Sequence, residues 1–271
     1  MATMTSTAPT STVGRRPPGI ALAIAAVAIL FFALPLIGLV VRAPWSDVWS
    51  ELTDDATVEA LRLSIVCSLA AAALSIVFGL PLAWVLARAE FPGQRLTRAV
   101  VTLPMVLPPV VGGVALFLAF GRNGLVGQYL DEWFGITLPF STAGVIVAET
   151  FVAMPFFVVA VEGALRSTDT RFEDAAATLG ARRLTVFRRV TVPMIGPAIA
   201  AGAVLSWARA LGEFGATITF AGNFPGRTQT MPLAIFFAFE TSTESAIALS
   251  LVLVAVSVVV LVALRDRWLR A

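Results

Sequence analysis

Charged side chains are rare inside the apolar segments of this sequence, and one pair of them has a telling spacing. Arg209 and Glu213 are four residues apart, about one helical turn, so their side chains can form an ion pair on one face of a helix. A charge inside a membrane span is costly and usually faces protein or water. Two interpretations are open: a self-neutralising pair near the outer interface of a membrane, or part of a gate or a pathway lining.

A second polar cluster lies between two long apolar runs, at residues 167–192. Acidic residues open it, Gly180 divides it, and four arginines crowd the part before Pro193. The spacing of apolar residues predicts a short helix over 171–179, a left-handed stop at Gly180, and a second, basic helix. Such a hairpin either lies on anionic lipid headgroups or binds a partner protein.

The residue types that most enzyme chemistry requires are missing from the sequence. There is no histidine, and the 19 basic residues are all arginine. A nucleotide-binding P-loop needs a lysine to reach the phosphates, so this chain carries none. Cys67 is the only cysteine, which excludes an intrachain disulfide, and Cys/His zinc sites and His-based triads are excluded too. We expect no catalytic residue, no cofactor and no metal ion in this chain.

Composition places the chain in a membrane. Of the 271 residues, 58% are hydrophobic and only 13% are charged, whereas a soluble domain carries about 25% charged residues. A helix needs about 20 apolar residues to cross a bilayer. We therefore expect an all-α integral membrane protein. The predicted spans are 19–41, 61–86, 99–120, 143–165, 194–211 and 246–264, with 231–239 as a shorter interfacial or re-entrant helix.

The arginines are unevenly distributed between alternate loops, which predicts the orientation. They cluster before the first span, between the second and third, between the fourth and fifth, and after the sixth. The other loops hold mostly acids, such as Asp47, Asp54 and Asp131. Both termini and the 167–192 segment are therefore expected in the cytoplasm.

The two ends of the chain are predicted to be tails. Residues 1–18 are small and polar and read as a disordered cytoplasmic tail, and 266–271 read as a short cytoplasmic tail. Alternatively, Arg15, Arg16 and the apolar run after them form a signal peptide. That run is long for such a peptide and ends in a poor cleavage site, so we expect 19–41 to be retained as the first transmembrane helix.

The third predicted span is rich in residues that interrupt helices. It contains Pro104, Pro108, Pro109, Gly112 and Gly113. Proline removes a backbone donor, and in lipid such a break is tolerated only against protein or along a water-filled path. The span is thus either a bendable helix that lines a pathway or a kinked helix that packs.

The spacing within 173–193 resembles the signature of permease subunits of binding-protein-dependent ABC importers. That signature is Glu-Ala-Ala, three residues, Gly, nine residues, then Ile-x-Leu-Pro. Here Asp174-Ala175-Ala176, Gly180 and Val190-Thr191-Val192-Pro193 keep every spacing. The departures are conservative: Asp replaces Glu, and valines replace Ile and Leu.

The resemblance implies a type I ABC importer permease fold with six transmembrane helices and a permease core at 55–265. In that family the 167–192 segment is a coupling helix that docks on a separate ATPase subunit, which binds the ATP. The implied partners are two copies of the ABC ATPase subunit, an external substrate-binding protein, a second copy of this chain and membrane lipids, with no nucleic acid. The implied coupling residues are Glu173, Asp174, Ala175, Ala176, Leu179, Gly180, Arg182 and Arg183.

A second stretch narrows the substrate. Residues 208–230 and 103–111 resemble molybdate permeases and, more distantly, sulfate/thiosulfate permeases. The resemblance implies ATP-driven passage of molybdate across the inner or plasma membrane. A sulfate, thiosulfate or tungstate permease is the alternative within transport, and a membrane scaffold or sensor with a basic hairpin is the alternative of another class. Candidate pathway or gate residues are Arg209, Glu213, Pro108 and Pro109.

Overall fold

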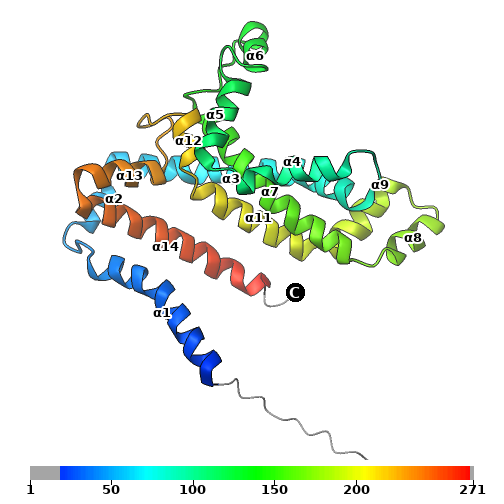
Figure 1. Cartoon of the computed structure of the whole chain (residues 1–271), viewed down its shortest axis with the longest axis horizontal. Coiled ribbons are helices and arrows are strands. Elements are labelled where there is room, and N and C mark those ends of the chain that lie inside the picture. Colours follow the sequence, from blue (N-terminus) through cyan, green and yellow to red (C-terminus); the bar gives the residue numbers. More distant parts are fainter. Residues whose placement is uncertain (1–18, 269–271) are drawn as a thin grey trace, which may run out of the picture. The chain divides into compact units, whose positions relative to one another are not determined.

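The computed structural model describes residues 19–268, and the regular structure within that range is entirely helical (Figure 1). This confirms the predicted all-α class. The predicted tail at 1–18 lies outside the described residues, as do residues 269–271 of the second tail, while 266–268 continue the last helix. The chain divides into two units, residues 1–43 and 44–271, which are described separately.

The first unit contains α1 (Gly19–Val41), which has the bounds of the first predicted span. Its 23 residues are apolar throughout, and none of them is buried. At 1.5 Å per residue such a helix is about 34 Å long, enough to cross a hydrocarbon core of about 30 Å.

The second unit is built around three helices that pack against one another: α3 (Asp55–Arg88), α7 (Thr142–Ser167) and α11 (Gly196–Leu211). Figure 1 shows α8 and α9 at the end of this bundle where α3 and α7 finish and α11 begins. The other elements of the unit are α2 (Val48–Thr53), α4 (Gln94–Val106), α5 (Pro109–Phe120), α6 (Gly127–Phe134), α8 (Arg171–Thr178), α9 (Arg183–Val186), η1 (Phe187–Thr191), α10 (Val192–Met194), α12 (Gly215–Phe220), α13 (Met231–Thr241) and α14 (Thr243–Trp268).

Phe157 of α7 fills the centre of this bundle because a glycine faces it from each neighbouring helix. A Cβ at Gly79 of α3 would lie 2.8 Å from the Phe157 ring, and one at Gly202 of α11 would lie 3.2 Å from it. The Phe157 side chain is fully buried. The two glycines therefore set how closely α3 and α11 approach α7.

Four helices are long and apolar enough to cross a membrane alone: α1, α3, α7 and α14 over Thr243–Val260. A fifth span arises if Arg183–Met194 and α11, which meet at a bend of 73°, count as one. The third predicted span is divided into α4 and α5, because the residues before Pro109 are extended and proline cannot continue the hydrogen-bond ladder. The count of six spans therefore stays a prediction.

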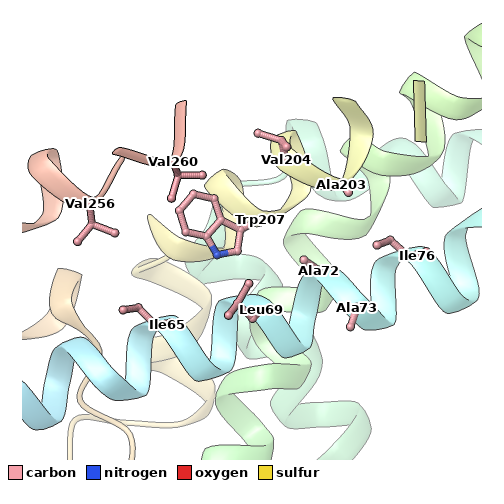
Figure 2. A pocket seen from close by; sticks show the side chains of 10 residues that line it. All are labelled: Ile65, Leu69, Ala72, Ala73, Ile76, Ala203, Val204, Trp207, Val256 and Val260. Carbon is pink, nitrogen blue, oxygen red and sulfur yellow. The ribbon is translucent and has the colours of Figure 1, made fainter. Parts of the chain in front are cut away.

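An apolar cavity of about 450 Å³ opens between α3, α11 and α14 (Figure 2). It offers no charged side chain to a polar solute. Its lining consists of Ile65, Leu69, Ala72, Ala73, Ile76, Ala203, Val204, Trp207, Val256 and Val260.

Candidate functional site

The predicted coupling segment begins with the short helix α8 and the expected tight turn. Gly180 adopts the left-handed conformation, with φ of 84°. The N–H of Ala181 donates to the carbonyl of Ala176 at 3.1 Å, and the N–H of Gly180 donates to that of Ala177 at 2.9 Å. This pair of hydrogen bonds is the Schellman pattern, which closes a helix around a left-handed residue. The predicted stop at Gly180 is confirmed.

The second half of the segment departs from the prediction of one basic helix. After α9 comes a π-helical turn, η1, and then the short α10. Pro193 lies in the first turn of α10, and Pro197 lies in the first turn of α11. Proline has no N–H to continue an α-helical ladder, and the turn before Pro193 is widened. Single π-turns occur often at functional sites.

The apolar face of α8 points away from the rest of the chain. Phe172 is 60% exposed and Leu179 is 89% exposed, and α8 buries none of its residues. An apolar patch with charged neighbours is typical of a protein-binding surface. Among the predicted coupling residues, Asp174, Ala175, Leu179, Gly180, Arg182 and Arg183 are exposed, and Ala176 is half-buried.

Glu173 has different surroundings from the other predicted coupling residues. Its Oε1 accepts hydrogen bonds from Nη2 of Arg88 and from Oγ1 of Thr191, both at 3.1 Å. Arg88 is the last residue of α3, and Thr191 is the buried end of η1. The sequence alone does not indicate this contact, because no spacing rule links residues 85 positions apart.

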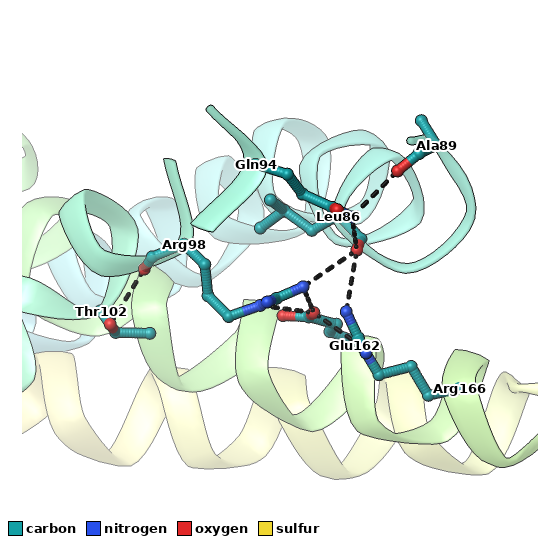
Figure 3. A network of polar contacts seen from close by, with 7 residues as sticks. All are labelled: Leu86, Ala89, Gln94, Arg98, Thr102, Glu162 and Arg166. Carbon is teal, nitrogen blue, oxygen red and sulfur yellow. Dashed lines mark hydrogen bonds and ion pairs between the residues drawn. The ribbon is translucent and has the colours of Figure 1, made fainter. Parts of the chain in front are cut away.

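A second polar cluster joins α3, α4 and α7 at the same end of the bundle (Figure 3). Oε1 of Glu162 accepts from Nε of Arg98 and from Nε of Arg166, each at 2.9 Å. Both guanidiniums and the Gln94 side chain also donate to the carbonyl of Leu86. That carbonyl lies in the last turn of α3, where helix carbonyls lack intrahelical partners. Glu162 and Arg166 are four residues apart on α7, where side chains one helical turn apart can pair, whereas no local spacing indicates the contact with Arg98.

The expected ion pair between Arg209 and Glu213 is present. Nη1 of Arg209 lies 2.6 Å from Oε2 of Glu213, whose side chain is 1% exposed. Oε1 of Glu213 accepts a hydrogen bond from the N–H of Ala216 at 2.8 Å, in the first turn of α12, where helix N–H groups are otherwise free. The buried carboxylate thus has a cationic partner and a backbone donor.

The helix break at Pro108 and Pro109 lies against protein close to this pair. Helix α5 packs on α12, and Gly215 of α12 faces Pro109 so closely that a Cβ there would lie 2.9 Å from the proline Cβ. Contact with protein is one of the settings in which a membrane helix tolerates a break. The structure therefore brings Pro109 and Glu213 to the start of the same short helix.

Sequence comparisons identify relatives among transport proteins. The family model described as "Binding-protein-dependent transport system inner membrane component" matches residues 75–271. The Molybdenum transport system permease protein ModB of Mycobacterium tuberculosis is 48% identical over 208 residues, which is 77% of this chain and 78% of the relative. ModB of Escherichia coli K12 is 46% identical over 183 residues (68% and 80%). The Sulfate transport system permease protein CysT of Salmonella typhimurium is 40% identical over 210 residues (76% of each).

Solved structures show the same fold at low sequence identity. A bacterial ABC transporter that imports the acidic polysaccharide alginate matches with a TM-score of 0.73 and 19% identity, over 93% of this chain and 94% of the other. The MetNI methionine ABC transporter matches with a TM-score of 0.57 and 20% identity, over 87% and 97%. The chain has several helices that are long and apolar enough to span a membrane, and it keeps the signature spacing from Asp174 to Pro193. It belongs to the family of inner-membrane components of binding-protein-dependent transport systems.

Proposed function

We propose that this chain is the permease of an ATP-driven importer that passes molybdate across the inner or plasma membrane. The observation that carries the proposal is the 46–48% identity to permeases named for molybdenum transport, compared with 40% to a sulfate permease. The stretches that resemble molybdate permeases include Arg209, Glu213 and the Pro108–Pro109 break. These residues would serve as the pathway or gate.

The importer would contain two copies of this chain, two copies of an ABC ATPase subunit and an external binding protein that delivers the anion. A single coupling segment per chain requires a second copy to engage an ATPase dimer symmetrically. The exposed Phe172 and Leu179 support α8 as the contact surface for the ATPase. Both termini would lie in the cytoplasm, and the ATP would be bound by the partner, since no lysine is present for a P-loop.

The proposed cycle is alternating access driven by the partner. ATP binding closes the two ATPase subunits and draws the two α8 helices together. That motion moves the helix bundle from an inward-open to an outward-open state, and the binding protein releases the anion into it. ATP hydrolysis then returns the permease to the inward-open state. The chain itself catalyses no chemical step.

The gate proposal is tested by neutralising the buried ion pair. Arg209→Gln alone leaves Glu213 as an uncompensated buried charge, and we expect the variant to lose about 3 kcal/mol of stability. Arg209→Gln with Glu213→Gln should restore stability, measured by thermal unfolding in detergent, but should lower the molybdate uptake rate. Normal uptake by the stable double variant would remove both residues from the gate.

The substrate is tested by uptake of labelled molybdate into cells that express this chain with its ATPase and binding protein. Excess unlabelled molybdate should abolish uptake, and sulfate at the same excess should leave most of it. Competition by unlabelled tungstate shows whether molybdate and tungstate share one transport pathway. Complete inhibition by sulfate, or transport of labelled sulfate at a higher rate, would contradict a molybdate permease and favour the sulfate alternative.

A further inference from the structure

We propose that Glu173 is a positioning residue that carries the motion of α8 to α3 and to the segment leading into α11. The inference rests on the proposed function and deepens it. It separates Glu173 from its neighbour Asp174, which is exposed and available to a partner. Glu173 would act inside this chain, through Arg88 and Thr191.

One carboxylate oxygen of Glu173 connects three elements of the fold. Arg88 ends α3 and Thr191 ends η1, and both donate to Oε1 of Glu173 in α8. The Glu173 and Arg88 side chains are only 18% and 17% exposed. Charge-assisted hydrogen bonds away from bulk water are the stronger kind, so the contacts of Glu173 with Arg88 and Thr191 can hold when α8 moves.

Other attachments of α8 are few. The helix buries no residue and packs mainly on α9 and η1. Of the side-chain hydrogen bonds and ion pairs described for residues 171–178, only those of Glu173 reach another helix. The Glu173–Arg88 pair is therefore the direct side-chain link from α8 to α3 among the described residues.

The space beside these contacts leaves α8 room to move. A cavity of about 450 Å³ lies between the end of α3, α8, α9 and η1, and its lining includes Arg88, Glu173, Ala177 and Thr191. Phe187 of η1 and Trp84 of α3 line the same cavity, and their rings stack edge-on with centroids 5.7 Å apart. The π-turn is thus held to α3 by its aromatic ring and to α8 by Thr191.

The end of α3 is also bound to α4 and α7, so a displacement of α3 moves these helices with it. The carbonyl of Leu86, two residues before Arg88, accepts hydrogen bonds from Arg98 of α4 and Arg166 of α7 (Figure 3). These arginines share Glu162. A pull on Arg88 therefore acts on a helix end that is already tied to α4 and α7.

The experiment compares transport with ATP hydrolysis in the complete complex. Glu173→Ala and Arg88→Ala permeases are purified with their ATPase and reconstituted in vesicles with the binding protein. ATPase co-purification, ATP hydrolysis and molybdate uptake are measured on the same preparations. We expect both variants to retain the ATPase and to hydrolyse ATP, while the molybdate carried per ATP falls about fivefold or more, the lower end of typical coupling between sites.

Three further variants separate transmission of motion from a merely structural role. Asp131→Ala removes a carboxylate–arginine pair of 2.8 Å between α6 and Arg122, which follows α5, and it should leave the molybdate-to-ATP ratio unchanged. The charge swap Glu173→Arg with Arg88→Glu should recover part of the ratio. Asp174→Ala should instead reduce ATPase co-purification.

A wild-type ratio in Glu173→Ala would overturn the inference, and so would loss of assembly with an unchanged ratio in the complexes that remain. If the alanine variant does not insert, Glu173→Gln, which keeps the acceptor oxygen and loses the charge, is measured in its place against the same outcomes. Failure of the wild-type complex to take up molybdate would refute the proposed function alone. The ratio would then be measured with the anion that the complex does carry.

Discussion

Neighbouring carboxylates in α8 have different surroundings although they are only one residue apart on the helix. Glu173 is half-buried and binds Arg88 and Thr191, whereas Asp174 is exposed at the edge of the same cavity. Successive positions on a helix point about 100° apart, so a partner that approaches α8 can contact Asp174 without disturbing Glu173. The family spacing selects Asp174 as the signature acid, and the resemblance groups Glu173 with it without separating their roles.

The left-handed turn at Gly180 gives a prediction with a close control. A side chain at Gly180 meets no atom within 4 Å, so the cost of Gly180→Val is the backbone strain at φ of 84°, about 1–3 kcal/mol. Gly93 has φ of 87° and similar open space, in a turn outside the coupling segment. We expect Gly180→Val to lose ATPase co-purification and transport, and Gly93→Val to retain both. Retained co-purification and transport in Gly180→Val would contradict a role for this turn, and equal loss in Gly93→Val would remove its specificity.

Asp131 provides a pH prediction outside the membrane spans. The hydrogen bond from Arg122, and after it the one from Thr137, holds the pKa of the Asp131 carboxyl below its usual value. Its stabilising contribution is therefore present above the unfolded-state pKa of about 3.9 and is lost as pH falls through the lower folded-state pKa. We expect the Asp131 carboxyl carbon to titrate, by NMR, with a midpoint below about 3.9. In Arg122→Gln that midpoint should rise, and an unchanged midpoint would exclude the arginine as the cause.

Local spacing predicted some of these residue contacts and missed others for a clear reason. The pairs Arg209–Glu213 and Glu162–Arg166 are four residues apart on one helix, where the spacing itself implies contact. Arg88–Glu173 and Arg98–Glu162 are 85 and 64 residues apart. Such pairs depend on how whole helices pack, which no local pattern in one sequence contains.

At the scale of elements, the best predictions came from long apolar runs and from Gly180. The first span was placed to the residue, and α8 and its stop were found from apolar spacing and a glycine. The division of 99–120 into α4 and α5 was foreseen only as a kink, because prolines indicate a weak point and not the angle taken there. The π-turn η1 had no sequence signal beyond Pro193.

The packing of α3, α7 and α11 is tested at Phe157. Phe157→Ala removes a fully buried ring that lies between two glycines, so the bundle cannot close the cavity with neighbouring side chains. We expect a loss of about 3–5 kcal/mol in unfolding free energy, measured by denaturant titration in detergent micelles. The control is Phe78→Ala, which removes a ring that is 58% exposed on α3, and it should cost far less. Similar losses would mean that Phe157 is not the centre of the core.

The second unit combines a packed helix bundle with an exposed short helix, α8, at one end. Apolar packing joins α3, α7 and α11, and arginine clusters hold the end at which α8 is attached. The surface formed by Phe172 and Leu179 at α8 is short, apolar and exposed, as is typical of a protein-binding surface. Family membership and membrane class were accessible from composition and from one spaced signature. The substrate depended on overall likeness to relatives, because no single side chain in the described bundle identifies the anion.

The most direct test of the account is ATP-dependent molybdate uptake by purified components. The chain is reconstituted in vesicles with its ATPase, and labelled molybdate is supplied with and without the external binding protein. We predict uptake that requires ATP, the ATPase and the binding protein together, and that persists in excess sulfate. Uptake that is independent of ATP or of the ATPase, or no molybdate uptake by a fully assembled complex that hydrolyses ATP, would contradict the account.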